Sequence, residues 1–194
     1  MIDAIALSFI VALLRKGNIK HLAELDLRHT WLIFAPGLCI VLLFLFTKYI
    51  PGMGFVDKLA PVMHIAAYLM VLVVIVLNRH LPGMALIGLG AALNFAAISA
   101  NGGKMPVSFE AAKYAKMEKV LRSDLARHSK IDGKTRLYVL TDVIPLRRPP
   151  FPLPGVMSVG DIALAIGLFL LIQHGVCPRK RSVKELVAGA DPAG

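Results

Sequence analysis

Residues 81–100 read LPGMALIGLGAALNFAAISA, a stretch without charged side chains in which Asn94 is the one strongly polar residue. A bilayer core about 30 Å thick is crossed by about 20 predominantly apolar residues in a helix. The stretch meets this requirement in both length and composition. We therefore predict that it forms a helix that spans a membrane.

Two further stretches, residues 31–50 and 59–77, have the same apolar character. The first contains Pro36-Gly37, which predicts a kink, because proline removes a hydrogen bond inside a helix. The second contains His64. Both stretches are predicted to span a membrane.

The remaining two apolar stretches need more argument. Residues 156–177 are long enough to span, but Asp161 lies near one end and His174 near the other. We expect these polar groups to lie at headgroup level, so that the stretch still crosses. Residues 2–14 are short for a span. We interpret them as a short first span, with an in-plane or re-entrant helix as the alternative.

The composition agrees with this interpretation. The chain is 57% hydrophobic and 18% charged, whereas a soluble domain is typically about 45–50% apolar and about 25% charged. The formal net charge is +10. The basic residues lie largely beside the apolar stretches, where the positive-inside bias and anionic lipids explain them, so nucleic-acid binding is not expected.

The positions of these basic residues predict an orientation. One side carries the largest cluster, which we assign to the cytoplasm: Arg15, Lys16, Lys20, Arg28, Arg79, Arg179, Lys180, Arg181 and Lys184. The C-terminus would then be cytoplasmic. The opposite side carries Lys48, Lys58 and the long, basic loop 101–155.

That loop is the main feature outside the predicted spans. Ser108 can cap a helix from Phe109 to about His128. Its apolar stripe and basic flank predict an amphipathic helix on the membrane surface or against the bundle. Five prolines between Pro145 and Pro154 then exclude a helix and favour an extended chain.

Small residues predict how the helices pack. Gly88, Ala92 and Ala96 recur every four residues, and residues 156–177 add Gly167. Such faces allow helices in a membrane to approach closely. The contact could be made within this chain, with a second copy, or with another membrane protein subunit.

A polar pocket at the outer face is the candidate site. His64, Asn94 and Asp161 lie toward the outer halves of their predicted spans, and Asn101 lies on the same helical face as Asn94. The long loop would close the pocket. The candidate ligand-binding residues are His64, Asn94, Asn101, Lys104, Asp142, Arg147 and Asp161.

Each of these residues also has a purely structural explanation, and for each one we favour that explanation over a role in binding. Asp161 fits a capping box with Ser158. Asn94 fits an interhelical hydrogen bond, and His64 a bond to a neighbouring carbonyl. Gly102-Gly103 fits a helix C-terminus. For the loop, a salt bridge between Asp142 and Arg147 or Arg148 competes with an anion-recognising patch.

The sequence contains no recognisable catalytic motif of the GxSxG, HExxH, P-loop or GxGxxG type in a suitable context. Cys39 and Cys177 lack a metal-like or CxxC spacing. We therefore predict no metal and no cofactor, and the sequence argues against an enzyme without excluding one.

Several motifs together resemble a known family. They are LRKG at residues 14–17, NGGKMPVS at 101–108, DVIPL at 142–146 and PLPGVMSVGDI at 152–162. The chain resembles an uncharacterised family of bacterial multipass membrane proteins, domain of unknown function number 5317. The resemblance implies a bacterial cytoplasmic (inner) membrane protein and supplies no activity.

The predicted fold is an all-α integral membrane helical bundle of four to five spans, with one long extramembrane loop containing an amphipathic helix. It forms a single membrane domain with spans at 2–14, 31–50, 59–77, 81–100 and 156–177, a loop at 101–155 and a basic tail at 178–194.

We expect an accessory protein or a binder of a lipid or other amphiphile. One alternative is a membrane enzyme or carrier acting on a lipid-linked substrate, with Asp161 or His64 handling a proton. The other is a homo-oligomeric transporter.

Overall fold

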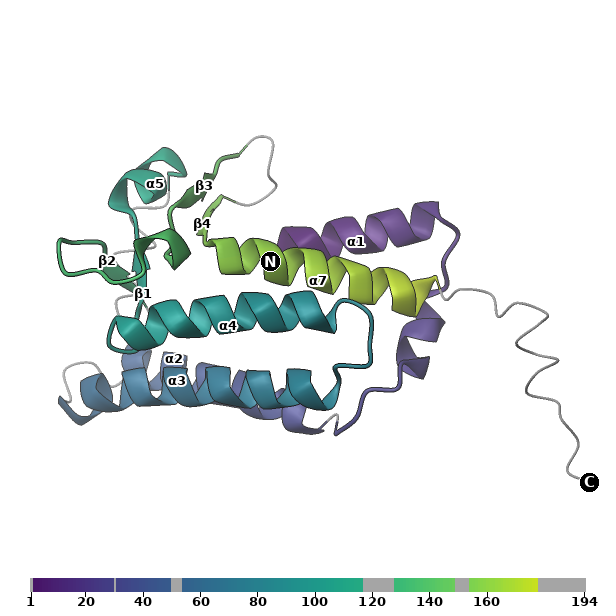
Figure 1. The fold of residues 1–194 in the computed structure, drawn as a ribbon, viewed down its shortest axis with the longest axis horizontal. Coiled ribbons are helices and arrows are strands. Elements are labelled where there is room, and N and C mark those ends of the chain that lie inside the picture. The colour runs from purple at the N-terminus through teal and green to yellow at the C-terminus, as the bar shows by residue number, and fades with distance from the viewer. Residues whose placement is uncertain (1, 30, 50–53, 117–127, 149–153, 178–194) are drawn as a thin grey trace, which may run out of the picture.

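The computed structural model describes residues 2–29, 31–49, 54–116, 128–148 and 154–177. The described chain is mostly helical, and its long helices lie side by side (Figure 1). They are α1 (Ile2–Leu14), α2 (Trp31–Tyr49), α3 (Gly54–Leu77), α4 (Met84–Ala100) and α7 (Val159–Val176).

The helices are not ordered in space as they are in sequence. α1 packs on α7, α7 on α4, α4 on α3, and α3 on α2. Successive long helices run in opposite directions along the molecule (Figure 1). The last of the described helices, α7, therefore lies between α1 and α4.

One end of the bundle holds the connections from α1 to α2 and from α3 to α4, together with the end of α7. The 3-10 helix η1 (Ile19–Glu24) follows α1, and the backbone N–H of Asn18 donates to the carbonyl of Val176 at 2.9 Å. The buried Asn78 side chain, at the end of α3, accepts from the N–H of Arg28 at 2.7 Å and donates to its carbonyl at 3.1 Å. These bonds hold the beginning of α2, the end of α3 and the end of α7 at one level.

The other end holds the small elements (Figure 1). They are β1 (Met105–Val107), α5 (Phe109–Tyr114), β2 (His128–Lys130), the 3-10 helix η2 (Tyr138–Leu140), β3 (Ile144–Leu146) and β4 (Gly155–Met157). β1 pairs with β2 in parallel, and β3 pairs with β4 antiparallel. The all-α prediction is therefore wrong in this region, although the long helices dominate the fold.

The predicted amphipathic helix from Phe109 to about His128 is also wrong in its extent. Ser108 does cap a helix, since its hydroxyl accepts from the N–H of Ala111. That helix, α5, ends at Tyr114, and Lys116 has a positive φ of 58°, which a continuing helix does not allow. His128 lies in strand β2. Residues 117–127 lie outside the described part of the chain, as does the basic tail 178–194.

Local chemistry explains why other boundaries differ from those predicted. The fourth helix begins at Met84 and not at residue 81, because Gly83 adopts φ 86° in the preceding turn. The last helix begins at Val159 and not at residue 156, because Ser158 is its N-cap. In contrast, α3 extends back to Gly54.

Glycines bring α4 and α7 into backbone contact. A Cβ on Gly90 would collide with the carbonyl oxygen of Gly160, and one on Gly167 with the carbonyl oxygen of Gly83. The expected contact between helices is thus confirmed for Gly167. Gly88 faces a different helix, since a Cβ at this position would meet the side chain of Ile75 in α3. Close backbone approach of this kind is how helices associate where no water-driven hydrophobic force operates.

One described helix, Val159–Val176, is long and apolar enough to cross a membrane, with a mean hydropathy of 1.8. The described residues also contain three shorter apolar helical segments, Asp3–Leu14, Pro61–Leu77 and Met84–Ala100. These features alone give a modest indication of membrane association.

Candidate functional site

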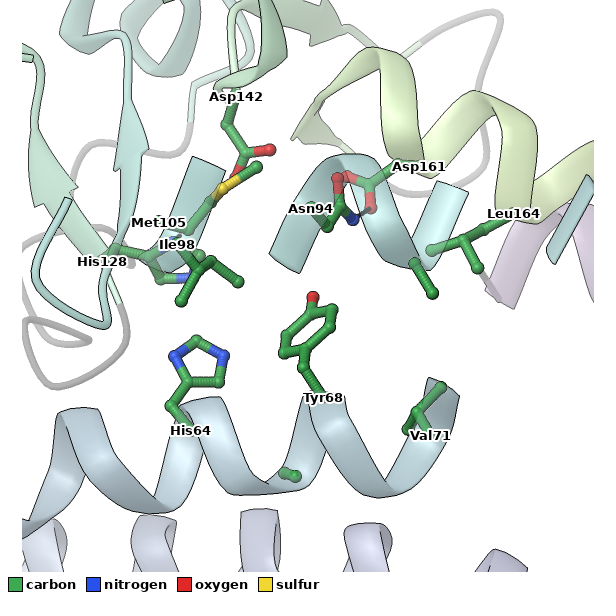
Figure 2. A pocket seen from close by; sticks show the side chains of 12 residues that line it. His64, Tyr68, Val71, Asn94, Ile98, Met105, His128, Asp142, Asp161 and Leu164 are labelled. Atoms are coloured by element: carbon green, nitrogen blue, oxygen red, sulfur yellow. Dashed lines mark hydrogen bonds and ion pairs between the residues drawn. The ribbon is translucent and has the colours of Figure 1, made fainter. Parts of the chain in front are cut away.

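A cavity of about 340 Å³ lies where α3, α4 and α7 meet the small elements (Figure 2). Its lining combines apolar and polar side chains from distant parts of the sequence. They are Ala67, Val71, Ala91, Ile98, Met105 and Leu164, together with His64, Tyr68, Asn94, His128, Asp142 and Asp161.

A hydrogen-bond network joins α4 to the start of α7. Asn94 donates to Asp161 Oδ1 at 2.8 Å, and the Ser158 hydroxyl donates to Asn94 Oδ1 at 2.8 Å. The Ser158 N–H donates to Asp161 Oδ2 at 3.2 Å, which completes a capping box. The structural explanations of Asn94 and Asp161 are therefore confirmed, although both side chains also line the cavity.

Replacing Ser158 by alanine is expected to lower the free energy of unfolding by about 2 kcal/mol, because the cap and the buried bond to Asn94 are lost together. Thermal unfolding in detergent measures the change. The matched control is Ser108→Ala, which removes only the cap of α5 and is expected to cost about 1 kcal/mol. Equal losses in the two variants would contradict a contribution from the bond between helices.

Asp142 reaches the cavity from the loop before β3. Its N–H donates to the carbonyl of Pro106 at 3.0 Å, and its carbonyl accepts from Ser108 at 2.8 Å, so its backbone is fixed beside β1. The residue is only 6% exposed, and its Oδ1 has no hydrogen-bond partner. Its Oδ2 lies 3.9 Å from Nδ1 of His128.

The surroundings of Asp142 favour its neutral form. Burial, and to a lesser degree the negative charge of Asp161, raise the pKa of Asp142 from 3.8 to about 8. Both effects penalise a buried negative charge. At neutral pH the carboxyl is therefore mostly protonated.

His64 and Tyr68 stand on the opposite wall of the cavity, on α3 (Figure 2). Nδ1 of His64 lies 2.9 Å from the carbonyl oxygen of Gly103, which confirms the predicted bond to a neighbouring carbonyl. Gly102 and Gly103 have φ of 70° and 81°, and Gly103 N–H donates to the carbonyl of Ile98. These glycines end α4, as their structural explanation required.

The other predicted residues do not line the cavity. Asn101 bonds to the carbonyl of Ala97 and to the backbone of Arg136. Lys104 is absent from the lining. The exposed Arg147 lies over the ring of Tyr114 at 5.5 Å. Among the described residues, His128 is the basic side chain within 4 Å of the Asp142 carboxyl, so the predicted salt bridge to Arg147 or Arg148 is wrong.

Sequence reasoning missed Tyr68, Met105 and His128 as lining residues. Tyr68 follows His64 by one helical turn, and this spacing could have identified it. No comparable signal marks His128, whose position depends on the pairing of β2 with β1. Among the described residues, no group of three or more His, Cys, Asp or Glu could hold a metal ion.

Comparison with known proteins identifies the family of this chain, and the description of that family names no activity. The model of a family described as "Family of unknown function (DUF5317)" matches residues 24–173. An uncharacterized protein of Thermotoga maritima is 32% identical over 174 residues, which cover 88% of this chain and 88% of that protein. No solved structure matches.

Proposed function

Because this chain belongs to the DUF5317 family of unknown function, we propose its role from its own geometry. It is a small multipass membrane protein that binds a small amphiphile in the cavity between α3, α4 and α7. The observation that carries this proposal is the cavity itself, in which six polar side chains converge within an otherwise apolar lining.

Exposed apolar side chains support the membrane location. Large ones protrude along every long helix, for example Leu7 (55% exposed), Phe34 (73%), Val76 (63%), Leu89 (52%) and Ile166 (48%). A soluble monomer rarely exposes contiguous apolar patches larger than a few hundred Å². Lipid tails would cover these surfaces without cost.

Helix lengths support four spans. α2, α3, α4 and α7 have 19, 24, 17 and 18 residues, and about 17–25 residues suffice to span. α1 has 13 residues. It crosses only part of the core or lies in its plane.

The basic residues support an orientation in which the cavity faces outward. Arg15, Lys20, Arg28 and Arg79 belong to the connections at the end of the bundle away from the cavity. The positive-inside rule places that end in the cytoplasm of the bacterium.

Cysteine labelling tests the location and the orientation together. Two variants would be made in a chain with Cys39 and Cys177 replaced by alanine: Lys130→Cys, at the exposed last residue of β2, and Lys20→Cys, at the opposite end. An impermeant maleimide applied to intact cells should label residue 130, and should label residue 20 only after lysis. The reverse pattern would invert the orientation, and labelled protein in the soluble fraction would contradict the membrane location.

The size and lining of the cavity support ligand binding. Small-molecule sites typically occupy about 300–1,000 Å³ and combine an apolar lining with a few placed polar groups. The cavity has both properties. Its apolar part would take the tail of an amphiphile, and its polar residues would take the head.

Filling the cavity should displace the ligand. Ala91 lines the cavity and is 1% exposed, whereas its neighbour Ala92 is exposed. We expect mass spectrometry of the protein purified from membranes to detect a small molecule bound to the wild type and to Ala92→Leu, and to find it depleted at least tenfold in Ala91→Leu. An unchanged complement in Ala91→Leu would contradict binding in this cavity.

A second candidate, a membrane enzyme or carrier acting on a lipid-linked substrate, is favoured by one observation. The buried Asp142 has a pKa near neutrality, as expected for a proton-handling group. Asp161, in contrast, uses both carboxylate oxygens in hydrogen bonds. Turnover of a candidate substrate that is lost in Asp142→Asn but retained in Asp161→Asn would favour this role.

A further inference from the structure

The titratable groups that line the cavity include no permanently charged cation. Its lining includes two carboxyl groups, of Asp142 and Asp161, and two imidazoles, of His64 and His128. No Lys or Arg is among the lining residues. A ligand with an anionic head would therefore meet the carboxylate of Asp161 without a permanent positive partner, and its binding would be opposed by repulsion.

The two carboxyl groups differ in what they can offer a ligand. Asp161 already accepts hydrogen bonds at both oxygens, from Asn94 and from Ser158. Asp142 is buried, with 6% of its surface exposed, and its Oδ1 lacks a hydrogen-bond partner. Figure 2 shows its carboxyl pointing from the loop into the space that Asn94, Asp161 and Tyr68 also face. A buried polar atom without a partner is rare in proteins and calls for an explanation.

We propose that this cavity recognises an organic cation, with a protonated amine held by the carboxylate of Asp142 and an apolar body against α3 and α7. This inference specifies the ligand class of the proposed binding function and rests on it. The ammonium would supply the donor that Asp142 lacks. The aromatic ring of Tyr68 lies on the facing wall, where it can also attract a cation. Ala67, Val71 and Leu164 would contact the apolar body.

Binding of an ammonium is coupled to the proton on Asp142. The groups around Asp142 are His128 from β2, Asp161 from α7, and His64 and Tyr68 from α3. The free carboxyl has a pKa of about 8, whereas the amine stays protonated to about pH 10. The complex requires the carboxylate, so binding at pH 7 releases a proton.

The test uses hexylamine, hexanol and hexanoate, titrated calorimetrically into the full-length protein in phosphatidylcholine nanodiscs. We expect hexylamine to bind at least tenfold more tightly than hexanol, and hexanoate to bind most weakly. The affinity for hexylamine should rise about tenfold per pH unit below pH 8. This comparison uses the wild-type protein, so it does not depend on whether a variant folds.

Substitution localises the head of the amine. Asp142→Asn is expected to weaken hexylamine binding about 10- to 100-fold and to leave hexanol binding unchanged, because only a charge-assisted bond is lost. The matched control is Asp132→Asn, which alters an exposed carboxylate of the same loop and should change neither affinity. Elution as a single species in size-exclusion chromatography verifies that each variant is folded.

The possible outcomes separate this inference from the function on which it rests. Equal affinities for the amine and the alcohol would overturn the cation inference and leave the cavity as a binding site. Failure of all three probes to bind would overturn both. Replacing half of the lipid by phosphatidylethanolamine identifies the source of the amine. Competition with hexylamine supports a lipid headgroup, and its absence supports a free amphiphilic amine.

Discussion

Replacing Gly160 by leucine is expected to destabilise the folded protein by about 3 kcal/mol, because α4 and α7 lose their closest contact. A Cβ at this position would collide with the side-chain oxygen of Asn94 and approach the carbonyl oxygen of Gly90 at 2.8 Å. Neither atom can retreat easily. Asn94 is held by Asp161 and Ser158, and the Gly90 carbonyl belongs to the backbone of α4. Thermal unfolding in detergent measures the loss.

Gly37 provides the matched control, since it also lies inside a long helix but has nothing within 4 Å of where a Cβ would stand. Gly37→Leu should be neutral or stabilising by up to about 1 kcal/mol, because glycine weakens a helix interior. If Gly160→Leu were as stable as Gly37→Leu, the close packing of α4 on α7 would be contradicted.

The second large effect is a dependence of stability on pH that Asp142→Asn removes. Asp142 has a pKa of 3.8 in the unfolded chain and about 8 in the folded protein. Between these values the unfolded state binds fewer protons, so the stability of the wild type falls as pH rises. The loss is absent below pH 3.8, is complete above pH 8, and amounts to on the order of 5 kcal/mol.

Asparagine carries no charge at any of these pH values, so Asp142→Asn should unfold at the same temperature as the wild type at pH 4 and at a higher temperature at pH 9. Thermal unfolding at the two pH values, without added amine, measures the difference. The exposed Asp132→Asn serves as the control and should follow the wild type throughout. Parallel curves for Asp142→Asn and the wild type would show that the folded protein does not bury a neutral Asp142.

The positions of the long helices could be predicted from sequence because they depend on local information. The length of an apolar stretch can be read directly from the sequence. The spacing of Ser158 and Asp161 alone marks the beginning of α7. The prediction of a helix from Phe109 to about His128 failed because of a single local conformation. The helix that begins at Phe109 ends because Lys116 has a positive φ, and no sequence pattern around Lys116 predicts this conformation.

Three of the six polar residues that line the cavity could be predicted for the same reason. His64, Asn94 and Asp161 lie toward the same end of antiparallel helices, so they meet once those helices pack. The partners of Asp142 depend on backbone pairing between distant segments. Val107 bridges to Asp142, and Met105 pairs with His128. Residue types and spacings do not encode such pairing, so Arg147 was the plausible but wrong partner.

The place of α7 between α1 and α4 has a consequence for biogenesis. Chains emerge from the ribosome N-terminus first, at about 5–20 residues per second. α1 and α4 are therefore synthesised before the helix that packs between them, and until then Gly90 on α4 and Ser8 on α1 lack their contacts with α7. Until α7 arrives, Ser8 lacks the carbonyl of Phe169 and the amide of Gln173. The packing of the bundle is thus completed only after α7 has been synthesised, when α7 joins α1 to α4.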